Sequence, residues 1–379
     1  MYQYQKTNKY FAQISSGMEN LGADELKELG AKNIQPMHRG IYFEANQETL
    51  YCINYQSRLI SRILAPLNKF ICHQTRYLYK KAREINWSEF FSVDQTFAIF
   101  ANVSNSKIKH SQYAAFILKD AIVDQFREKI GKRPNIEKIN PDVWINLHIE
   151  SDFATISWDT SGGSLHRRGY RTESVEAPMQ ETLAAAIIRL SEWDGTIPIY
   201  DPFCGSGTLL CEALMRYCNI PANFLRKKFG FEFLPDFEKI IWEKVKKETP
   251  KKMIELKDGL ISGSDISHKS ISAAKKNIKN LPCGEKIKIK KIDFQKIEKL
   301  EKAIIVCNPP YGIRQGSKKE VGELYKSFGD FLKHKCQDST VFIYFGDRKL
   351  IGKIGLKPSW RKPLRNGGLD GRLTKFEIY

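Results

Sequence analysis

The stretch that decides the fold is Ile197-Pro198-Ile199-Tyr200-Asp201-Pro202-Phe203-Cys204-Gly205-Ser206-Gly207-Thr208. Its first four residues are mostly apolar and predict a strand, and the apolar residues within 209–214 predict a helix. A glycine-rich turn between them lets a ligand approach the backbone closely, because glycine has no Cβ. The first amides of the helix can then bind a negatively charged group. Gly-x-Gly alone would suit a dinucleotide-binding enzyme equally well, so a second motif must decide the chemistry.

That second motif is Asn308-Pro309-Pro310-Tyr311, which follows a predicted strand at 303–307. The prolines fix the backbone, so that Oδ1 of Asn308 and the carbonyl oxygen of Pro309 can face the same way. Two fixed acceptors match the two hydrogens of an exocyclic amine, and Tyr311 can stack on the base that carries it. Together the motifs predict methyl transfer from S-adenosylmethionine, with Asn308, Pro309 and Tyr311 as catalytic residues. The alternative is a loop in which the prolines merely end a strand.

The C-terminal part of the chain alternates between predicted strands and helices. Strands are expected at 197–200, 260–264, 287–291, 303–307 and 341–345, and helices at 182–190, 209–214, 267–278 and 294–300. This alternation predicts an α/β fold class with a Rossmann-like, doubly wound parallel sheet. In such a sheet the ligand binds beyond the carboxyl ends of the strands.

Acidic residues follow three of these strands and are expected to bind the cofactor. Asp201 can accept hydrogen bonds from its cationic amine end, Asp265 from the ribose hydroxyls and Asp293 from the adenine amino group. The whole predicted cofactor site is Asp201, Phe203, Gly205, Gly207, Thr208, Asp265, Ile266, Asp293 and Phe294. Asp265 could instead cap the next helix, since it lies far beyond the ~20-residue spacing of a dinucleotide fold. An insertion at 223–248 explains the spacing, and its Phe and Trp side chains require a surface to pack on.

The N-terminal half is expected to contain two small α+β units. A strand at 10–15, a helix at 18–29, a strand pair at 34–44 and a helix at 49–64 suggest a ferredoxin-like unit. A strand at 69–73, helices at 77–91 and 112–129, a strand at 96–103 and a hairpin at 144–158 form the second unit. With a joint at 161–164, the predicted domains are 1–62, 63–164 and 165–379.

The charge of the chain indicates a polyanionic partner. Lys and Arg number 61 against 43 Asp and Glu, which gives a net charge of +18. Nucleic acid is the first partner to consider for such a surplus. The expected RNA-binding residues are Lys107 and Lys109 in the second unit, and Arg167, Arg168, Tyr170 and Arg171 beside the joint. A solvated charged face, or a tie between the two halves of the chain, is the alternative.

The eight cysteines are scattered and show no metal-binding spacing. Cys204, Cys211 and Cys218 recur every seventh residue, which places them on one face of a helix and in the core. Free thiols, no apolar signal segment and no long apolar run predict a cytoplasmic protein without a membrane anchor. No metal is expected, because a sulfonium is already activated and the enzyme needs only to align it.

The motifs resemble those of a known family, the THUMP-domain RNA methyltransferases that modify the 2-amino group of guanine. The likeness runs through 17–26, 165–171, 177–186, the glycine turn, Asn308-Pro309-Pro310-Tyr311-Gly312 and 366–370. It implies that ferredoxin-like and THUMP domains dock structured RNA and deliver a guanosine to the C-terminal half. It also implies 23S ribosomal RNA as the substrate ahead of transfer RNA.

Two other functions remain open from the sequence. Asn-Pro-Pro-Tyr also serves methylation of the adenine 6-amino group, so the motif does not separate the two bases. A catalytically silent RNA-binding or assembly factor is the second alternative, although intact Asp201, Gly205, Gly207, Asp293 and Asn308 argue against it. No obligate protein partner is inferred.

Overall fold

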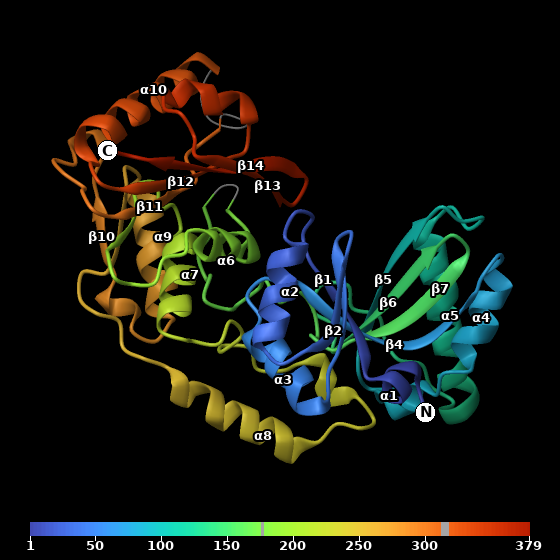
Figure 1. Ribbon diagram of the computed structural model, residues 1–379. Helices are drawn as coiled ribbons and strands as arrows, with labels where there is room; N and C mark the ends of the chain where they lie inside the picture. The colour runs from blue at the N-terminus through green and yellow to red at the C-terminus, as the bar shows by residue number, and fades with distance from the viewer. Residues whose placement is uncertain (176–177, 312–317) are drawn as a thin grey trace. The chain divides into compact units, whose positions relative to one another are not determined.

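The computed structural model describes residues 1–175, 178–311 and 318–379. Ala177 and Gly312, which belong to two of the quoted motifs, lie outside the described residues. The chain forms two compact units (Figure 1). The first consists of 1–14, 22–165 and 226–246, and the second of 15–21, 166–225 and 247–379.

A single seven-stranded sheet, in the order β2-β3-β1-β4-β7-β6-β5, forms the centre of the first unit. Its strands are β1 (Lys9–Gln13), β2 (Lys32–Met37), β3 (Gly40–Glu44), β4 (Arg62–Ile71), β5 (Phe97–Ser104), β6 (Val143–Glu150) and β7 (Phe153–Asp159). Its helices are α1 (Gln3–Thr7), α2 (Glu19–Glu28), α3 (Gln47–Gln56), α4 (Thr75–Arg83) and α5 (Ser111–Ile130). Strand β4 pairs with β1 on one side and β7 on the other, so it joins the two predicted small units into one sheet.

Two predicted helices of this unit are shorter than expected. The helix expected at 49–64 ends at Gln56, because the polar groups of the next residues donate hydrogen bonds to the buried carboxylate of Glu25. It accepts hydrogen bonds from Ser57 Oγ at 2.6 Å and from the amide of Arg58 at 2.8 Å. The helix expected at 77–91 is α4 followed by a separate 3-10 turn at Trp87–Glu89. The indole of Trp87 donates to the carbonyl of Ala82 at 2.9 Å, which stabilises the break.

Most of the predicted insertion, residues 226–246, packs within the first unit. The insertion contains a 3-10 turn (Gly230–Phe233) and helix α8 (Lys239–Glu248). Tyr51 of α3 stacks on Phe231 with ring centroids 4.4 Å apart, and Trp242 meets Phe231 edge-on at 5.0 Å. The aromatic residues therefore have the packing surface that their composition required, and α3 provides it.

The second unit contains the α/β sheet, in the order β10-β9-β8-β11-β12-β14-β13. Its strands are β8 (Ile199–Asp201), β9 (Ile261–Asp265), β10 (Lys288–Lys291), β11 (Ile304–Cys307), β12 (Thr340–Phe345), β13 (Trp360–Asn366) and β14 (Leu369–Glu377). Strands β10, β9, β8, β11 and β12 are parallel, and β14 and β13 add an antiparallel hairpin at the end. The predicted doubly wound sheet is confirmed, and the hairpin is an addition that the sequence did not predict.

Helices cover both faces of this sheet (Figure 1). They are α6 (Glu181–Leu190), α7 (Thr208–Tyr217), α9 (His268–Lys279) and α10 (Lys318–Lys335). Helix α10 and the 3-10 segment Arg348–Ile354 pack on alternate buried residues of β11, β12 and β14. The helix expected at 294–300 is only a 3-10 turn at Phe294–Lys296, which Asp293 begins by accepting from the amide of Gln295 at 3.0 Å.

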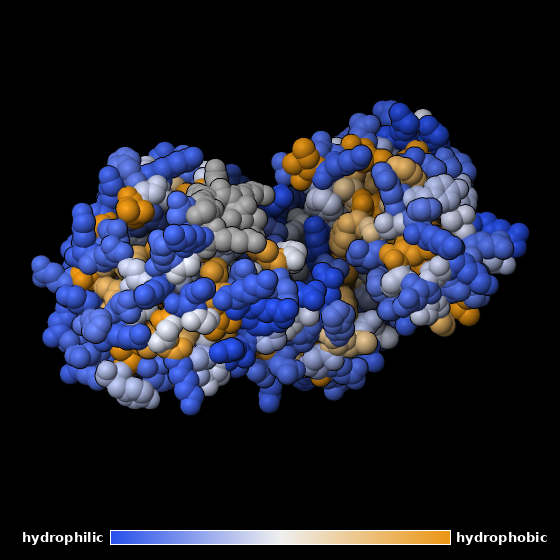
Figure 2. Space-filling view, turned by 90° about the horizontal axis from the view of Figure 1, so that it is seen from above, coloured by the Kyte–Doolittle hydropathy of each residue, from blue (hydrophilic) through white to orange (hydrophobic). Residues whose placement is uncertain are grey.

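Cys204, Cys211 and Cys218 are buried, as predicted, but only Cys211 lies within α7, since Cys204 belongs to the glycine turn and Cys218 follows the helix. All eight cysteines are free thiols. Charged and polar side chains cover most of the visible surface, with smaller hydrophobic groups between them (Figure 2). Within the described parts of the chain, no helix combines the length and the apolar character that crossing a membrane requires.

Candidate active site at the carboxyl edge of the parallel sheet

The parallel strands that follow β8 in the chain are added first on one side of it, as β9 and β10, and then on its other side, as β11 and β12. Strand β8 has β9 on one side and β11 on the other, which makes this the topological switch point of the sheet. Asp201 ends β8, Asp265 ends β9, Asp293 follows β10 and Asn308 follows β11. Four of the sequence-predicted site residues therefore lie at the edge where an open α/β sheet binds its ligand.

The carboxyl group of Asp201 is buried in this edge, with a relative exposure of 1%. One of its oxygens, Oδ1, accepts a hydrogen bond from the amide of Phe203 at 3.0 Å. Burial raises the pKa of Asp201 well above its ordinary value, and the negative charge of nearby Asp265 adds to the shift. A cationic ligand group placed beside Asp201 would favour its ionised form. The site thus fits the amine end of the expected cofactor.

Asp265 supports the glycine turn directly. Its Oδ2 accepts from the amide of Gly205 at 3.0 Å, and its Oδ1 accepts from the amide of Ser267 at 2.8 Å. The cap of α9 is Ser267, whose hydroxyl accepts from the amide of Ser270 at 3.3 Å. The helix-capping alternative for Asp265 is therefore wrong, because another residue has that role. The next side chain, Ile266, is 67% exposed and offers an apolar surface at the same edge.

The glycines of the turn have conformations that other residues rarely adopt. Gly205 has φ of 53° and Gly207 has φ of 84°, in the left-handed region. A Cβ on Gly207 would also come within 3.3 Å of Ala274 on α9. Thr208 begins α7, but its buried hydroxyl accepts from the guanidinium of Arg171 at 2.9 Å. This bond uses a lone pair of the hydroxyl oxygen, so the hydroxyl hydrogen and the backbone amide of Thr208 both remain as donors.

The segment predicted to bind RNA beside the joint is mostly internal. Arg168 is 1% exposed and its Nε lies 3.5 Å from Oε1 of Glu212 on α7. Tyr170 is fully buried and donates to the same oxygen at 3.1 Å. The predicted RNA contacts of Arg168 and Tyr170 are therefore wrong, since both side chains are buried and pair with a carboxylate.

Arg171 also points inward, whereas its neighbour does not. Its guanidinium donates to the carbonyl of Met179 at 2.8 Å and lies 3.4 Å from the carboxylate of Glu181. It is thus a link within the second unit rather than an RNA-binding residue. Arg167 is exposed and remains a candidate, as do the exposed side chains of Lys107 and Lys109 in the first unit.

Asn277 of α9 is a structural residue that the sequence analysis missed. Its Oδ1 accepts from the amides of Thr172 and Glu173 at 2.9 and 3.0 Å, and its Nδ2 donates to the carbonyl of Ser206 at 3.0 Å. It thereby ties the segment after Arg171 to the glycine turn. No local sequence pattern marks such a role, because the partners lie far away in the chain.

The Asn308 loop contains an unused acceptor. Oδ1 of Asn308 is buried and accepts no hydrogen bond from any residue that the structure describes. The carbonyl oxygen of Pro309 receives a long hydrogen bond of 3.4 Å from the hydroxyl of Tyr325. The ring of Tyr311 lies against Gly346, where a Cβ would come within 2.8 Å of it. A buried acceptor without a partner is costly, so its presence indicates a ligand with a polar hydrogen at this position.

Phe203 and Phe294 lie together beneath this edge. Their ring centroids are 5.2 Å apart, and both contact Phe328 of α10. Phe294 is buried in this cluster, whereas Phe203 is only partly buried. Phe203 is therefore the one of the two whose ring is more accessible to a ligand.

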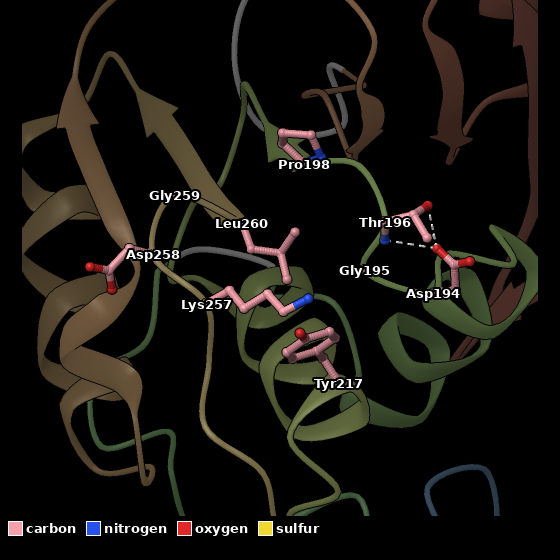
Figure 3. A pocket seen from close by; sticks show the side chains of 9 residues that line it. All are labelled: Asp194, Gly195, Thr196, Pro198, Tyr217, Lys257, Asp258, Gly259 and Leu260. Carbon is pink, nitrogen blue, oxygen red and sulfur yellow. Dashed lines mark hydrogen bonds between the residues drawn. The ribbon is translucent and has the colours of Figure 1, made fainter.

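A hollow of about 410 Å³ lies elsewhere in the second unit (Figure 3). Pro198 and Leu260, which line it, precede β8 and β9, so it lies at the amino ends of these strands. Asp201, Asp265 and Asn308 lie at the opposite, carboxyl ends of the strands, and none of them lines this hollow. Among the described residues, no group of three or more metal-ligating side chains is found.

Comparison with known protein families matches almost the whole chain. Residues 168–375 match the RMKL-like methyltransferase domain, 75–159 the THUMP domain and 9–64 the RlmL ferredoxin-like domain. The chain belongs to the THUMP-domain RNA methyltransferases. It is an S-adenosylmethionine-dependent RNA methyltransferase of class I, as the sequence motifs predicted.

Several relatives of this THUMP-domain methyltransferase are similar along its full length. A Synechocystis protein that carries the name of an RNA methyltransferase is 38% identical, over 98% of this chain and 97% of its own. The ribosomal RNA large subunit methyltransferases K/L of Photobacterium profundum and Vibrio campbellii are 37% and 38% identical, again over 98% of this chain. The chain spans only 53% of the length of these K/L proteins.

Two solved structures share the fold, and one of them contains the product form of the cofactor. A methyltransferase crystallised with S-adenosylhomocysteine is 29% identical, with a TM-score of 0.86 and coverage of 98% of each chain. A methylase from Clostridium difficile is 27% identical, with a TM-score of 0.85 and the same coverage. The predicted cofactor, S-adenosylmethionine, is thus confirmed, and the buried carboxyl group of Asp201 and the unused acceptor of Asn308 lie at the edge where a ligand binds.

Proposed function

We propose that this protein methylates the exocyclic 2-amino group of a guanosine in structured RNA, with large-subunit ribosomal RNA as the substrate. The Oδ1 of Asn308, which accepts no hydrogen bond from a described residue, carries the proposal, because a planar amine is the donor that fits a buried amide oxygen beside a tyrosine ring. S-adenosylmethionine supplies a methyl group that its positive sulfur already activates.

The residues of the chain bind and align the reactants. Asn308 Oδ1 accepts one hydrogen of the target amine, and the second lone pair of the Pro309 carbonyl oxygen accepts the other. Holding both hydrogens turns the nitrogen lone pair out of conjugation with the ring. The ring of Tyr311, backed by Gly346, supports the plane of the base. The contribution of the loop is alignment, which can lower a barrier by several kcal/mol.

Cofactor binding is assigned to the neighbouring strand ends. Asp201 holds the amine, Asp265 the ribose hydroxyls and Asp293 the adenine amino group. Gly205 and Gly207 leave room for the ligand. The exposed Ile266 and the partly buried Phe203 provide apolar contacts, while Phe294 supports Phe203 from beneath.

Ribosomal RNA is favoured over transfer RNA, because the named K/L relatives act on the large subunit's RNA and match 98% of this chain. Transfer RNA remains the second candidate. Adenine methylation also has support, since a structure named as an N6-adenine-specific DNA methylase from Listeria monocytogenes is 25% identical with a TM-score of 0.84.

The domain boundaries 1–62, 63–164 and 165–379 remain our proposal for the evolutionary units. Within them, the first two dock RNA through basic residues such as Lys107 and Lys109, and the third carries the chemistry. A cytoplasmic location is also proposed, and the eight free thiols support it.

The test is transfer of labelled methyl groups into unmodified large-subunit ribosomal RNA, transfer RNA and DNA, followed by digestion to nucleosides. Label in N2-methylguanosine from ribosomal RNA is expected. Label in N6-methyladenosine would contradict the guanine assignment, and label from transfer RNA alone would contradict the ribosomal one.

A further inference from the structure

The hairpin of β13 and β14 extends beyond the sheet at the catalytic edge. Strand β14 pairs with β12 as far as Arg372 opposite Phe345, where β12 ends. It continues to pair with β13 up to Leu369 opposite Asn366. Because Phe345 ends a parallel strand, the tip of the hairpin lies past the carboxyl edge of the sheet, where Asn308 also lies.

Charged side chains gather on one face of this tip. Arg372 and Asp370 are two residues apart on β14 and therefore share a face, and Arg365 stands directly opposite Asp370. Arg372 binds Asp370 through two hydrogen bonds, of 2.7 and 3.2 Å. That bond lowers the pKa of Asp370, and the positive charges of Arg365 and Arg348 lower it further.

Positive charge exceeds negative charge in this group, which we call the arginine cluster: Arg348, Arg365 and Arg372 around Asp370. Arg348 and Arg365 are exposed, and neither forms an ion pair with a carboxylate in the part of the chain that the structure describes. Asp347, the exposed acid that precedes Arg348 in the chain, accepts a hydrogen bond from the amide of Lys349 at Oδ1, at 2.9 Å. Two guanidinium groups are thus left to bind an anion.

The arginine cluster lies beside the proposed base-binding loop. Phe345, the partner of Arg372, belongs to the hydrophobic cluster against which Tyr311 packs. Gly346, the next residue, contacts the Tyr311 ring. Arg348 follows two positions later, at the start of a 3-10 segment. The residues of the arginine cluster therefore follow or pair next to the strand end that supports Tyr311.

We propose that the arginine cluster binds a backbone phosphate of the RNA strand next to the target nucleotide. This inference rests on the proposed RNA substrate and adds a site to it. Guanidinium groups match phosphate oxygens in pairs, and a phosphate held beside Tyr311 would fix the position from which the base enters the loop. Arg372 is kept in place by Asp370, while Arg348 and Arg365 provide the unpaired donors.

The test compares Arg348→Ala/Arg365→Ala with the wild type on unmodified large-subunit ribosomal RNA. The half-saturating RNA concentration in single-turnover methylation is expected to rise about tenfold. The slope of log affinity against log salt should fall by about 0.7 for each single-strand phosphate that the variant no longer binds. Affinity for S-adenosylmethionine, measured by calorimetry, and the melting temperature should stay at the wild-type values.

Two further variants exclude an unspecific charge effect. Arg361→Ala removes an exposed arginine from the same strand and the same face, farther from the tip, and should leave RNA binding unchanged. Arg365→Lys keeps the charge and should keep the salt slope while losing part of the affinity. If the double variant matched the wild type in half-saturation and salt slope, the phosphate site would be refuted while the proposed function stood. A wild-type protein that methylated no RNA would refute both.

Discussion

Replacing Asn308 by Ala tests the proposed amine-binding role most directly. In the free protein Oδ1 of Asn308 is buried and accepts no hydrogen bond from a described residue. Its acceptor capacity is used only when a donor binds. Asn308→Ala should therefore remove an interaction of the bound state and leave the contacts of the free protein nearly unchanged.

The expected magnitude follows from the cost of leaving a buried donor unpaired, here a hydrogen of the target amine, which is about 1–3 kcal/mol. The upper part of this range corresponds to roughly a 100-fold change in rate, at about 1.36 kcal/mol for each factor of ten. We expect at least that loss in turnover, because the methyl and the amine also lose their alignment. The free energy of unfolding without ligands should stay the same or rise, since the variant buries one unpaired polar group fewer.

The assay is single-turnover methylation with saturating enzyme, together with direct binding of RNA and of S-adenosylmethionine. Both affinities should change little, because phosphate contacts and the Asp201 region are untouched. Asn308→Asp retains an acceptor at the same position and serves as the matched control, with a smaller loss of rate. A near-normal rate for Asn308→Ala would refute the amine-binding role.

Three other predictions concern the cofactor site and the insertion. The folded-state pKa of Asp201 lies above its unfolded value, so its stabilising contribution is present below the unfolded pKa and is lost as pH rises through the folded one. In urea unfolding without ligand, the free energy of unfolding of Asp201→Asn should therefore fall less than that of the wild type between pH 4 and 7. Calorimetry should show that the variant binds S-adenosylmethionine more weakly. If the stability of the variant and of the wild type depended equally on pH, the burial argument would be contradicted. Asp265→Ala should weaken cofactor binding by about 1–3 kcal/mol, and an unchanged calorimetric Kd would limit Asp265 to supporting the turn. Trp242→Ala should lower the free energy of unfolding by about 3–5 kcal/mol, since the side chain is buried among aromatic rings, and a denaturant midpoint equal to that of the wild type would contradict this.

The sequence predicted the parallel sheet and its carboxyl edge well. Both follow from local patterns: apolar strands alternate with helices, and polar residues such as Asp201, Asp265 and Asn308 stand where each strand ends. The topology then brings these residues to one edge without any further information. Their positions could be predicted because each depends on its own strand and on a general rule of parallel sheets.

The predictions that were wrong concern residues whose hydrogen-bond partners are distant in the chain. The arginines and tyrosine at 167–171 have the composition of an RNA-binding segment, yet Arg168 and Tyr170 pair with Glu212 inside the fold. The helix expected to run past Gln56 ends there because Glu25 binds the following amides. Neither carboxylate is close in sequence to the groups that it binds, so periodicity and composition could not reveal these pairings.

The insertion changes how the catalytic half can be studied in isolation. Its aromatic residues form one cluster with Tyr51 of α3, and 226–246 belongs to the first compact unit. A fragment of 166–379 would carry Phe231 and Trp242 without that partner and expose them to water. Full-length variants are therefore the proper test of the chemistry, and poor behaviour of the fragment would say nothing about its active site.

The two residues with the clearest functional assignment both bury a polar group at an energetic cost in the free protein. Asp201 is a buried carboxyl group whose ionisation burial opposes, and Asn308 has a buried oxygen with no described partner. In a core each would be a defect that reduces stability. At the switch point of the sheet each is the group that a ligand would complete, Asp201 by a cation and Asn308 by an amine. A sequence can locate such residues by strand and motif, but only the burial of Asp201 and the unused acceptor of Asn308 show what a ligand would complete.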